Sequence, residues 1–176
     1  SAVLVVANSN LSMGFDEAEH DRLVQLEYAV TVIESGEIAD GSFTIDNCNE
    51  FDLLIISESI MSYEADNIIG TTTPIMHNES HGWDNWLFTA AGAGGWQVGI
   101  NVNIVDDTHP IIVDAGVSLG EMQFYDPQGE WTTELISLLA PGAELIAKMT
   151  PLNSTDEHAI IFAIEEGAEL ADGSAA

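Results

Sequence analysis

Basic residues are almost absent from this sequence of 176 residues. Lysine and arginine together number 2, against 30 aspartates and glutamates, which gives a formal net charge of −28. Proteins that bind nucleic acids or anionic membranes need clustered lysine and arginine to displace counterions from phosphate groups. The composition therefore predicts no nucleic-acid partner and no anionic-membrane partner.

Cysteine is also scarce, since Cys48 is the single one. One cysteine excludes an intrachain disulfide and any metal site that needs several thiolates. No apolar stretch approaches the length of a membrane-spanning helix, about 20 residues, and no signal-peptide pattern is present. The sequence begins at Ser1, without methionine, and enters an apolar run at once. We interpret this start as a processed N-terminus or as a domain cut from a larger protein.

The charge of this chain is compatible with folding in ordinary salt. A folded protein of this mass exposes roughly 8,000 Å², so that the net charges lie about 17 Å apart on average. The screening length is about 8 Å at physiological salt and about 3 Å at 1 M. Abundant acids with almost no lysine resemble the composition of halophile proteins, and we expect a saline environment. An extracellular or cell-surface location is the first expectation, and a salt-rich cytoplasm is the alternative.

Hydrophobic periodicity predicts an α/β chain. The first half alternates strands, at 2–7, 30–33, 51–57 and 74–78, with helices at 16–28, 65–69 and 83–91. The second half is mostly strand, at 97–105, 109–112, 117–125, 144–149 and 159–165. This order predicts a doubly wound, mainly parallel sheet with an antiparallel extension in the C-terminal half. We expect one domain over residues 1–170 and a linker-like tail at 171–176.

Three short segments carry a family resemblance: FDLLIIS at 51–57, PIM at 74–76 and DTHPI at 107–111. Together with the strand, polar loop and acidic helix before them, they resemble the class I glutamine amidotransferase-like superfamily. The resemblance is strongest to its trehalose-utilisation-like branch and to domains of secreted bacterial proteins. It implies a three-layer flavodoxin-like fold and, in catalytic members, a cysteine nucleophile on a sharp turn after a central strand. The matching segment, 76–82, contains no cysteine, and Cys48 lies far upstream, so we do not expect glutamine hydrolysis.

A serine lies in the segment where that nucleophile is expected. Residues 78–82, NESHG, approximate the G-x-S-x-G motif, with Ser80 as nucleophile and His109 or His158 as base. Asn78 replaces the first glycine, however, and removes the close backbone approach that the motif needs. The alternative interpretation is a turn in which Ser80 caps the following helix.

Two sets of side chains could bind metal ions. His77, Glu79 and His81 recur with a period of two, so a strand that continues through them would place all three on one face, as zinc requires. A turn near Asn78 would scatter them instead. Surface carboxylates are also expected to bind calcium or magnesium weakly, without the spacing of a calcium loop. Examples are Asp46, Glu50 and Asp52.

Trp83, Asp84 and Asn85 could form a site for sugars, with the indole as a stacking face and the polar side chains as hydrogen-bond partners. Trp86, at helical spacing from Trp83, is expected to be buried, which leaves Trp83 as the exposed candidate. No cofactor fingerprint is present, because the loop at 8–14 lacks the threonine pattern of flavodoxins.

The leading hypothesis from these patterns is a non-catalytic binding or structural domain of a larger secreted or surface protein from a saline environment. Its expected partners are carbohydrate or other domains of the same polypeptide. A serine hydrolase that uses Ser80 is the first alternative. Self-association into a fibre or layer, through the edge strand at 97–105, is the second.

Overall fold

A computed structural model describes residues 1–90, 95–99, 101–123, 129–152 and 154–176, and only the backbone of 95–96 and 129–132. The chain divides into two compact units, Ser1–Trp86 and Leu87–Ala176. A single domain over residues 1–170 stays a prediction. The ends of two predicted segments, residue 91 of 83–91 and residues 124–125 of 117–125, and residue 100 inside the predicted strand at 97–105, lie outside the described residues.

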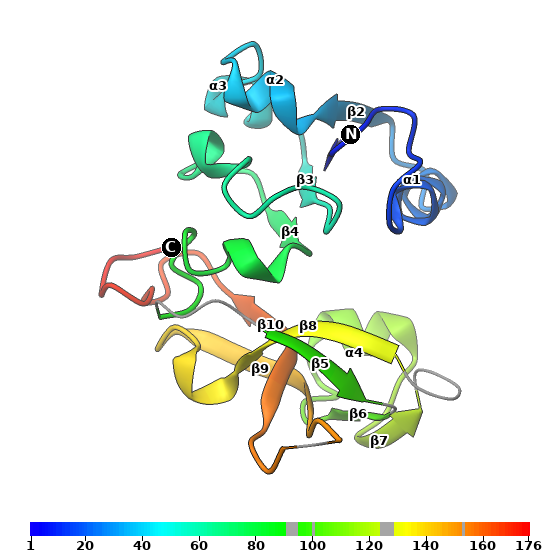
Figure 1. The fold of residues 1–176 in the computed structure, drawn as a ribbon, viewed down its shortest axis with the longest axis vertical. Helices are drawn as coiled ribbons and strands as arrows, with labels where there is room; N and C mark the ends of the chain where they lie inside the picture. Colours follow the sequence, from blue (N-terminus) through cyan, green and yellow to red (C-terminus); the bar gives the residue numbers. More distant parts are fainter. Residues whose placement is uncertain (91–94, 100, 124–128, 153) are drawn as a thin grey trace. The chain divides into compact units, whose positions relative to one another are not determined.

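A parallel sheet forms the centre of the first unit (Figure 1). Its strands are β1 (Ala2–Val6), β2 (Val30–Glu34), β3 (Leu53–Ile56) and β4 (Ile75–His77), in the order β2-β1-β3-β4. Every pair is parallel, and Leu4 of β1 lies between Val32 and Ile55. All five residues of β1 are buried, as the continuous apolar run predicts for a strand covered on both faces.

Helices cover both faces of this sheet, so the first unit has three layers. Figure 1 shows α1 (Asp16–Gln25) on one side, and α2 (Ser35–Ala39) and α3 (Ile45–Cys48) on the other. Two 3₁₀ turns, η1 (Asp66–Ile68) and η2 (Ser80–Gly82), follow β3 and β4. The sequence pattern does not predict α2 and α3, because helices of four or five residues show little periodicity. Each begins with a capping box instead, at Glu34 and at Thr44.

The helix predicted at 83–91 is wrong. Residues 83–87 form turns, and Leu87 has a φ of 60°. This angle lies in the left-handed region and is incompatible with an α-helix. The sequence pattern could not show this strained residue, because leucine rarely adopts a positive φ.

The strand predicted at 109–112 is also wrong, since these residues begin helix α4 (Pro110–Ala115). His109 caps the helix, Pro110 occupies its first position, and Gly116 ends it with a φ of 67°. Proline at the first position and glycine just after the last are common start and stop signals of a helix. Ile111 and Ile112 are apolar and β-branched, which favours a strand, and the helix signals lie in the residues around them.

An antiparallel sheet forms the second unit. Its strands, in chain order, are β5 (Gly95–Gly99), β6 (Asn101–Ile104), β7 (Gly120–Gln123), β8 (Gly129–Leu135), β9 (Ala143–Met149) and β10 (His158–Ile164). They pair in the order β5-β8-β10-β9-β6-β7, and a 3₁₀ turn, η3 (Ile136–Leu138), follows β8. Among the described residues this sheet is separate from the parallel one, whereas the sequence order predicted an extension of it.

Alternating burial gives the antiparallel sheet one apolar face and one polar face. In β6, Val102 and Ile104 are buried in the core with Ile112 and Ile146, while Asn101 and Asn103 point to the other face. The alternation predicted over 97–105 is therefore confirmed for β6.

The last residues of the chain fold back on the segment before them. The amide of Ala176 donates to the carbonyl of Ala168, and the amide of Gly167 donates to the carbonyl of Ala176. A linker role for 171–176 rests on composition alone and stays a prediction.

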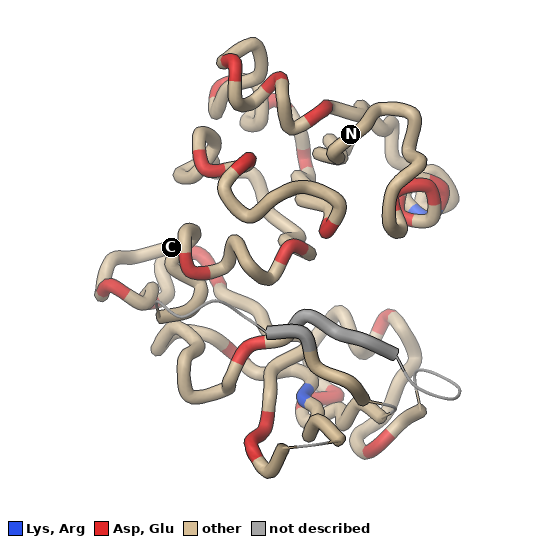
Figure 2. Tube along the Cα trace, viewed as in Figure 1, with Lys and Arg blue, Asp and Glu red and all other residues tan. Residues whose placement is uncertain are grey.

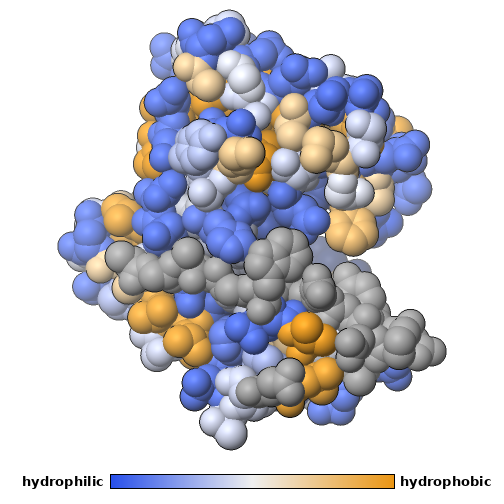
Figure 3. Space-filling model, in the orientation of Figure 1, coloured by the Kyte–Doolittle hydropathy of each residue, from blue (hydrophilic) through white to orange (hydrophobic). Residues whose placement is uncertain are grey.

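The surface is acidic throughout the described residues. Figure 2 shows acidic positions spread along both units beside the two basic ones, and Figure 3 shows apolar side chains in small separate patches among hydrophilic ones. Among the described helices, none is long and apolar enough to cross a bilayer.

Candidate functional site

The turn after β4 does not have the geometry of a nucleophile elbow. Ser80 is 2% exposed, and its Oγ has no hydrogen-bond partner among the described residues. A nucleophile elbow holds its serine in a strained, exposed turn. The described non-glycine residues with a positive φ are Leu11, Glu27 and Leu87, so Ser80 is not strained in this way. Glu79, and not Ser80, caps the turn, because its Oε1 accepts from the amide of His81 at 2.8 Å.

The two histidines proposed as bases have local roles in the second unit, whereas Ser80 belongs to the first. His109 accepts from the amide of Ile111 at 3.3 Å through Nδ1 and so caps α4. His158 is 7% exposed, its Nδ1 lies 2.9 Å from Oγ1 of Thr133, and burial lowers its pKa. Capping and core hydrogen bonding therefore account for both side chains within their own unit.

The residues of the expected metal triad are not grouped as ligands. Glu79 and His81 form a pair at 3.1 Å, but the His77 ring packs edge-on against Trp86, with ring centroids 5.3 Å apart. Burial lowers the pKa of His77 to about 4. In the part of the chain that the structure describes, no three His, Cys, Asp or Glu side chains are arranged to hold a metal ion. The chain turns in η2, directly after Glu79, whereas the alternative interpretation placed the turn near Asn78.

Trp83 is buried, at 7% exposure, which corrects the expectation that it is exposed; Trp86, at 4%, is buried as predicted. The turn brings the indole back onto β4, where Nε1 of Trp83 donates to the carbonyl of His77 at 3.0 Å. The two polar neighbours are also engaged. The amide nitrogen of the Asn85 side chain donates to the Asp66 carboxylate at 3.1 and 3.2 Å, and Oδ1 of Asp84 accepts from the Asn85 backbone.

Cys48 is unsuited to a catalytic role. Its side chain is buried at the end of α3, and burial raises the pKa of its thiol to about 11. The thiol is therefore protonated at neutral pH, whereas the nucleophile of catalytic cysteines is the thiolate.

A buried polar network that the sequence pattern did not predict lies at the carboxyl ends of β3 and β4. Asp16, the first residue of α1, is fully buried, and its Oδ1 accepts from Oγ of Ser57 at 2.5 Å. One turn further, Oε1 of Glu19 accepts from the side-chain amide of Asn78 at 2.6 Å. Burial raises the pKa of Glu19 from 4.5 to about 7, although the bond from Asn78 lowers it. Two features of the sequence could have indicated this network. Asp16 and Glu19 are acids at positions i and i+3 of one helix, and the polar Ser57 and Asn78 directly follow two strands.

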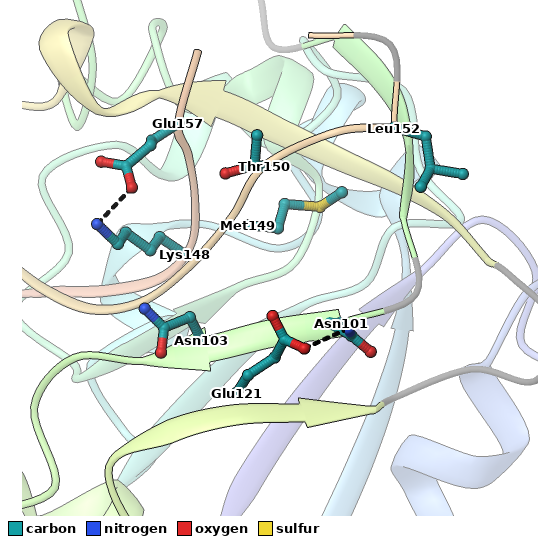
Figure 4. Close-up of a pocket in the computed structure, with 8 residues that line it drawn as sticks. All are labelled: Asn101, Asn103, Glu121, Lys148, Met149, Thr150, Leu152 and Glu157. Atoms are coloured by element: carbon teal, nitrogen blue, oxygen red, sulfur yellow. Dashed lines mark hydrogen bonds and ion pairs between the residues drawn. The ribbon is translucent and has the colours of Figure 1, made fainter. Parts of the chain in front are cut away.

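The second unit contains a polar pocket with a volume of about 350 Å³ (Figure 4). Cross-strand pairing builds its floor, because Asn103 of β6 lies directly opposite Glu121 of β7 and opposite Lys148 of β9. Directly opposed residues of antiparallel strands project from the same face. Asn101 lies two positions from Asn103 and so joins this face. The walls are completed by Met149, Thr150, Leu152 and Glu157.

Two polar pairs cross this pocket. Nζ of Lys148 lies 2.5 Å from Oε1 of Glu157, and the side-chain amide of Asn101 donates to Oε1 of Glu121 at 2.6 Å. Asn103 lies between these pairs, and no hydrogen bond to its side chain is found among the described residues. The pocket thus presents amide, ammonium, hydroxyl and carboxylate groups together, which can both donate and accept hydrogen bonds.

A solved structure shares this fold. No family model matches the sequence, and no curated protein matches it. The crystal structure of a protein from Bacteroides uniformis ATCC 8492, described as ThuA-like, superposes with a TM-score of 0.58 and 12% sequence identity. The match covers 92% of this chain and 76% of that chain. The chain has a ThuA-like, flavodoxin-like fold.

In a ThuA-like fold the carboxyl ends of the parallel strands are the edge where open α/β sheets bind ligands. Here that edge carries the network of Asp16, Glu19, Ser57 and Asn78. The segment at 76–82, which includes the end of β4, contains the buried Ser80 and no cysteine. The similarity to the Bacteroides protein concerns the fold, and at 12% identity it assigns no activity.

Proposed function

We propose that this chain is a non-catalytic binding domain, and that its ligand is a neutral, hydroxyl-rich molecule of carbohydrate type. The observation that carries this proposal is the pocket over β6, β7 and β9, where Asn103 lies between Glu121 and Lys148. Amide and carboxylate side chains are suited to sugar hydroxyls, because each hydroxyl both donates and accepts. The volume lies at the lower end of the range for small-molecule sites.

The charge of the pocket favours a neutral ligand. Lys148 is already paired with Glu157, and Glu121 adds a second carboxylate. A net charge of −28 on the whole chain further repels anions. The exposed side chain of Leu152 supplies apolar contact for the face of a sugar ring.

Replacing Asn103 with alanine is expected to weaken carbohydrate binding about tenfold, the loss that corresponds to one hydrogen bond of about 1.4 kcal/mol. Isothermal titration calorimetry with a panel of neutral oligosaccharides measures this loss. The matched control is Asn85→Ala in the first unit, which should leave the affinity unchanged. Absence of any carbohydrate affinity, or a loss in the Asn85 variant alone, would contradict the pocket as the site.

The family branch and the cellular setting of the chain are also proposed. We place the chain in the trehalose-utilisation-like branch of the class I glutamine amidotransferase-like superfamily, as a member without the cysteine nucleophile. We also propose that it is part of a larger secreted or surface protein in a saline environment. The supporting observations are the ThuA-like fold, the acidic composition and the absence of cysteine at 76–82.

A serine-reactive fluorophosphonate probe tests the catalytic alternative. We expect no labelling of the native protein, because Ser80 is buried and its Oγ lacks a hydrogen-bonded base among the described residues. Mass spectrometry of the intact protein measures the adduct. Labelling of the wild type that disappears in Ser80→Ala would establish the hydrolase instead.

A further inference from the structure

Two carboxyl groups on α1 each have one buried oxygen for which no hydrogen bond is found among the described residues. Oδ2 of Asp16 and Oε2 of Glu19 are buried and lack a hydrogen-bond partner among the described residues. Their positions, i and i+3 of one helix, place them on the same face. A buried acceptor without a donor destabilises a fold, and two neighbouring carboxylates repel each other.

We propose that Glu19 carries a proton that it donates to the Asp16 carboxylate, and that this proton locks the first turn of α1 onto the carboxyl ends of β3 and β4. A protonated Glu19 donates from Oε2 while its Oε1 still accepts from Asn78. The same proton supplies the donor that Oδ2 of Asp16 lacks, while its Oδ1 remains bonded to Ser57. It also removes the repulsion between the two carboxylates.

The charged groups around the pair are acids and not cations. Glu58, directly after Ser57, has a pKa that is raised by burial and by the charges of Glu79 and Asp16. Glu79, after β4, is already paired with His81.

The basic side chains of the helix do not neutralise the pair either, since Nδ1 of His20 lies 3.3 Å from Oδ1 of Asp21. Arg22 is exposed in the last turn of α1, and among the described ion pairs none includes Asp16 or Glu19. A proton is therefore the available counter-charge.

The lock depends on pH in a defined direction. Glu19 has a pKa of about 7 in the folded state, against 4.5 ordinarily, so the proton stabilises the closed turn fully below pH 4.5. That stabilisation is lost as the pH rises from 4.5 to about 7. Over this window the opening equilibrium of the turn rises about tenfold per pH unit.

Hydrogen exchange on the full chain tests the lock. We measure the Glu19 amide, which donates to the carbonyl of Phe15, and correct for intrinsic exchange rates. Protection should fall at least tenfold between about pH 5 and about pH 7 in the wild type. It should stay constant in Glu19→Gln, whose amide donates at every pH, and Glu17→Gln, an exposed control on the same helix, should behave as the wild type.

The carboxyl carbon of Glu19 gives a second, direct readout that does not depend on a variant. Its ¹³C NMR shift should titrate with a midpoint near 7, and not near 4.5. A midpoint near 4.5, or pH-independent protection of the wild type, would overturn the proposal. The same pH dependence in Glu19→Gln as in the wild type would overturn it too.

Discussion

Raising the NaCl concentration from about 0.1 M to about 2 M is expected to raise the free energy of unfolding by about 2 to 3 kcal/mol. Two unit charges about 17 Å apart interact in water by about 0.2 kcal/mol, which screening at 0.1 M reduces to about 0.04 kcal/mol. A net charge of −28 makes about 80 such neighbouring pairs, and their repulsion sums to about 3 kcal/mol. Repulsion within the unfolded chain offsets part of this sum.

Urea denaturation measures this effect, because urea is uncharged and adds no screening of its own. A variant with glutamine at three exposed positions, Glu165, Glu166 and Glu169, should gain less from salt, since it has fewer like charges to screen. Sucrose at matched water activity separates screening from general exclusion effects. A free energy of unfolding that stays flat or falls over this range of salt would count against adaptation to a saline environment.

Replacing Leu4 with alanine is expected to lower the free energy of unfolding by about 3 to 5 kcal/mol. Leu4 is fully buried in β1, which lies between β2 and β3 in the sheet. It packs in a cluster with Val6, Leu23 and Ile55. Truncation removes buried methyl groups and leaves a cavity that a strand paired on both sides cannot close.

Leu26→Ala provides the matched control, because the same substitution at a side chain that is 52% exposed should cost no more than about 0.5 kcal/mol. Urea unfolding, followed by tryptophan fluorescence, measures both variants. Equal losses in the two variants would contradict the central position of β1. A small loss at Leu4 would indicate that this sheet adds little to the stability of the chain.

Strong local patterns predicted much of the first unit. The run at 2–7 is β1, the acidic amphipathic segment is α1, and the segments around Leu54 and Ile75 are β3 and β4. The helix at 83–91 and the strand at 109–112 failed for local reasons, a left-handed Leu87 and a capped proline helix. Hydrophobic periodicity shows neither the left-handed residue nor the helix cap.

The candidate sites were harder to predict than the fold. The spacing of His77, Glu79 and His81 is that of ligands on one face of a strand. The strand ends at His77 and the chain turns at Ser80, so these side chains do not share a face. The pocket residues are far apart in sequence, and Glu121, Asn103 and Lys148 become neighbours only through strand register. Register depends on long-range pairing, which a single sequence does not display.

The sequence by itself determined the acidity, the absence of a cysteine nucleophile at 76–82, the α/β class and the buried character of β1. Each of these follows from composition or from the period of apolar residues along the chain. Only the tertiary structure decided which acids are buried. Asp16 and Glu19 resemble their exposed neighbours in sequence, and they differ because Ser57 and Asn78, at the ends of two strands, lie against that face of α1. Burial by distant segments, and not the local pattern, raises the pKa of Glu19 to about 7.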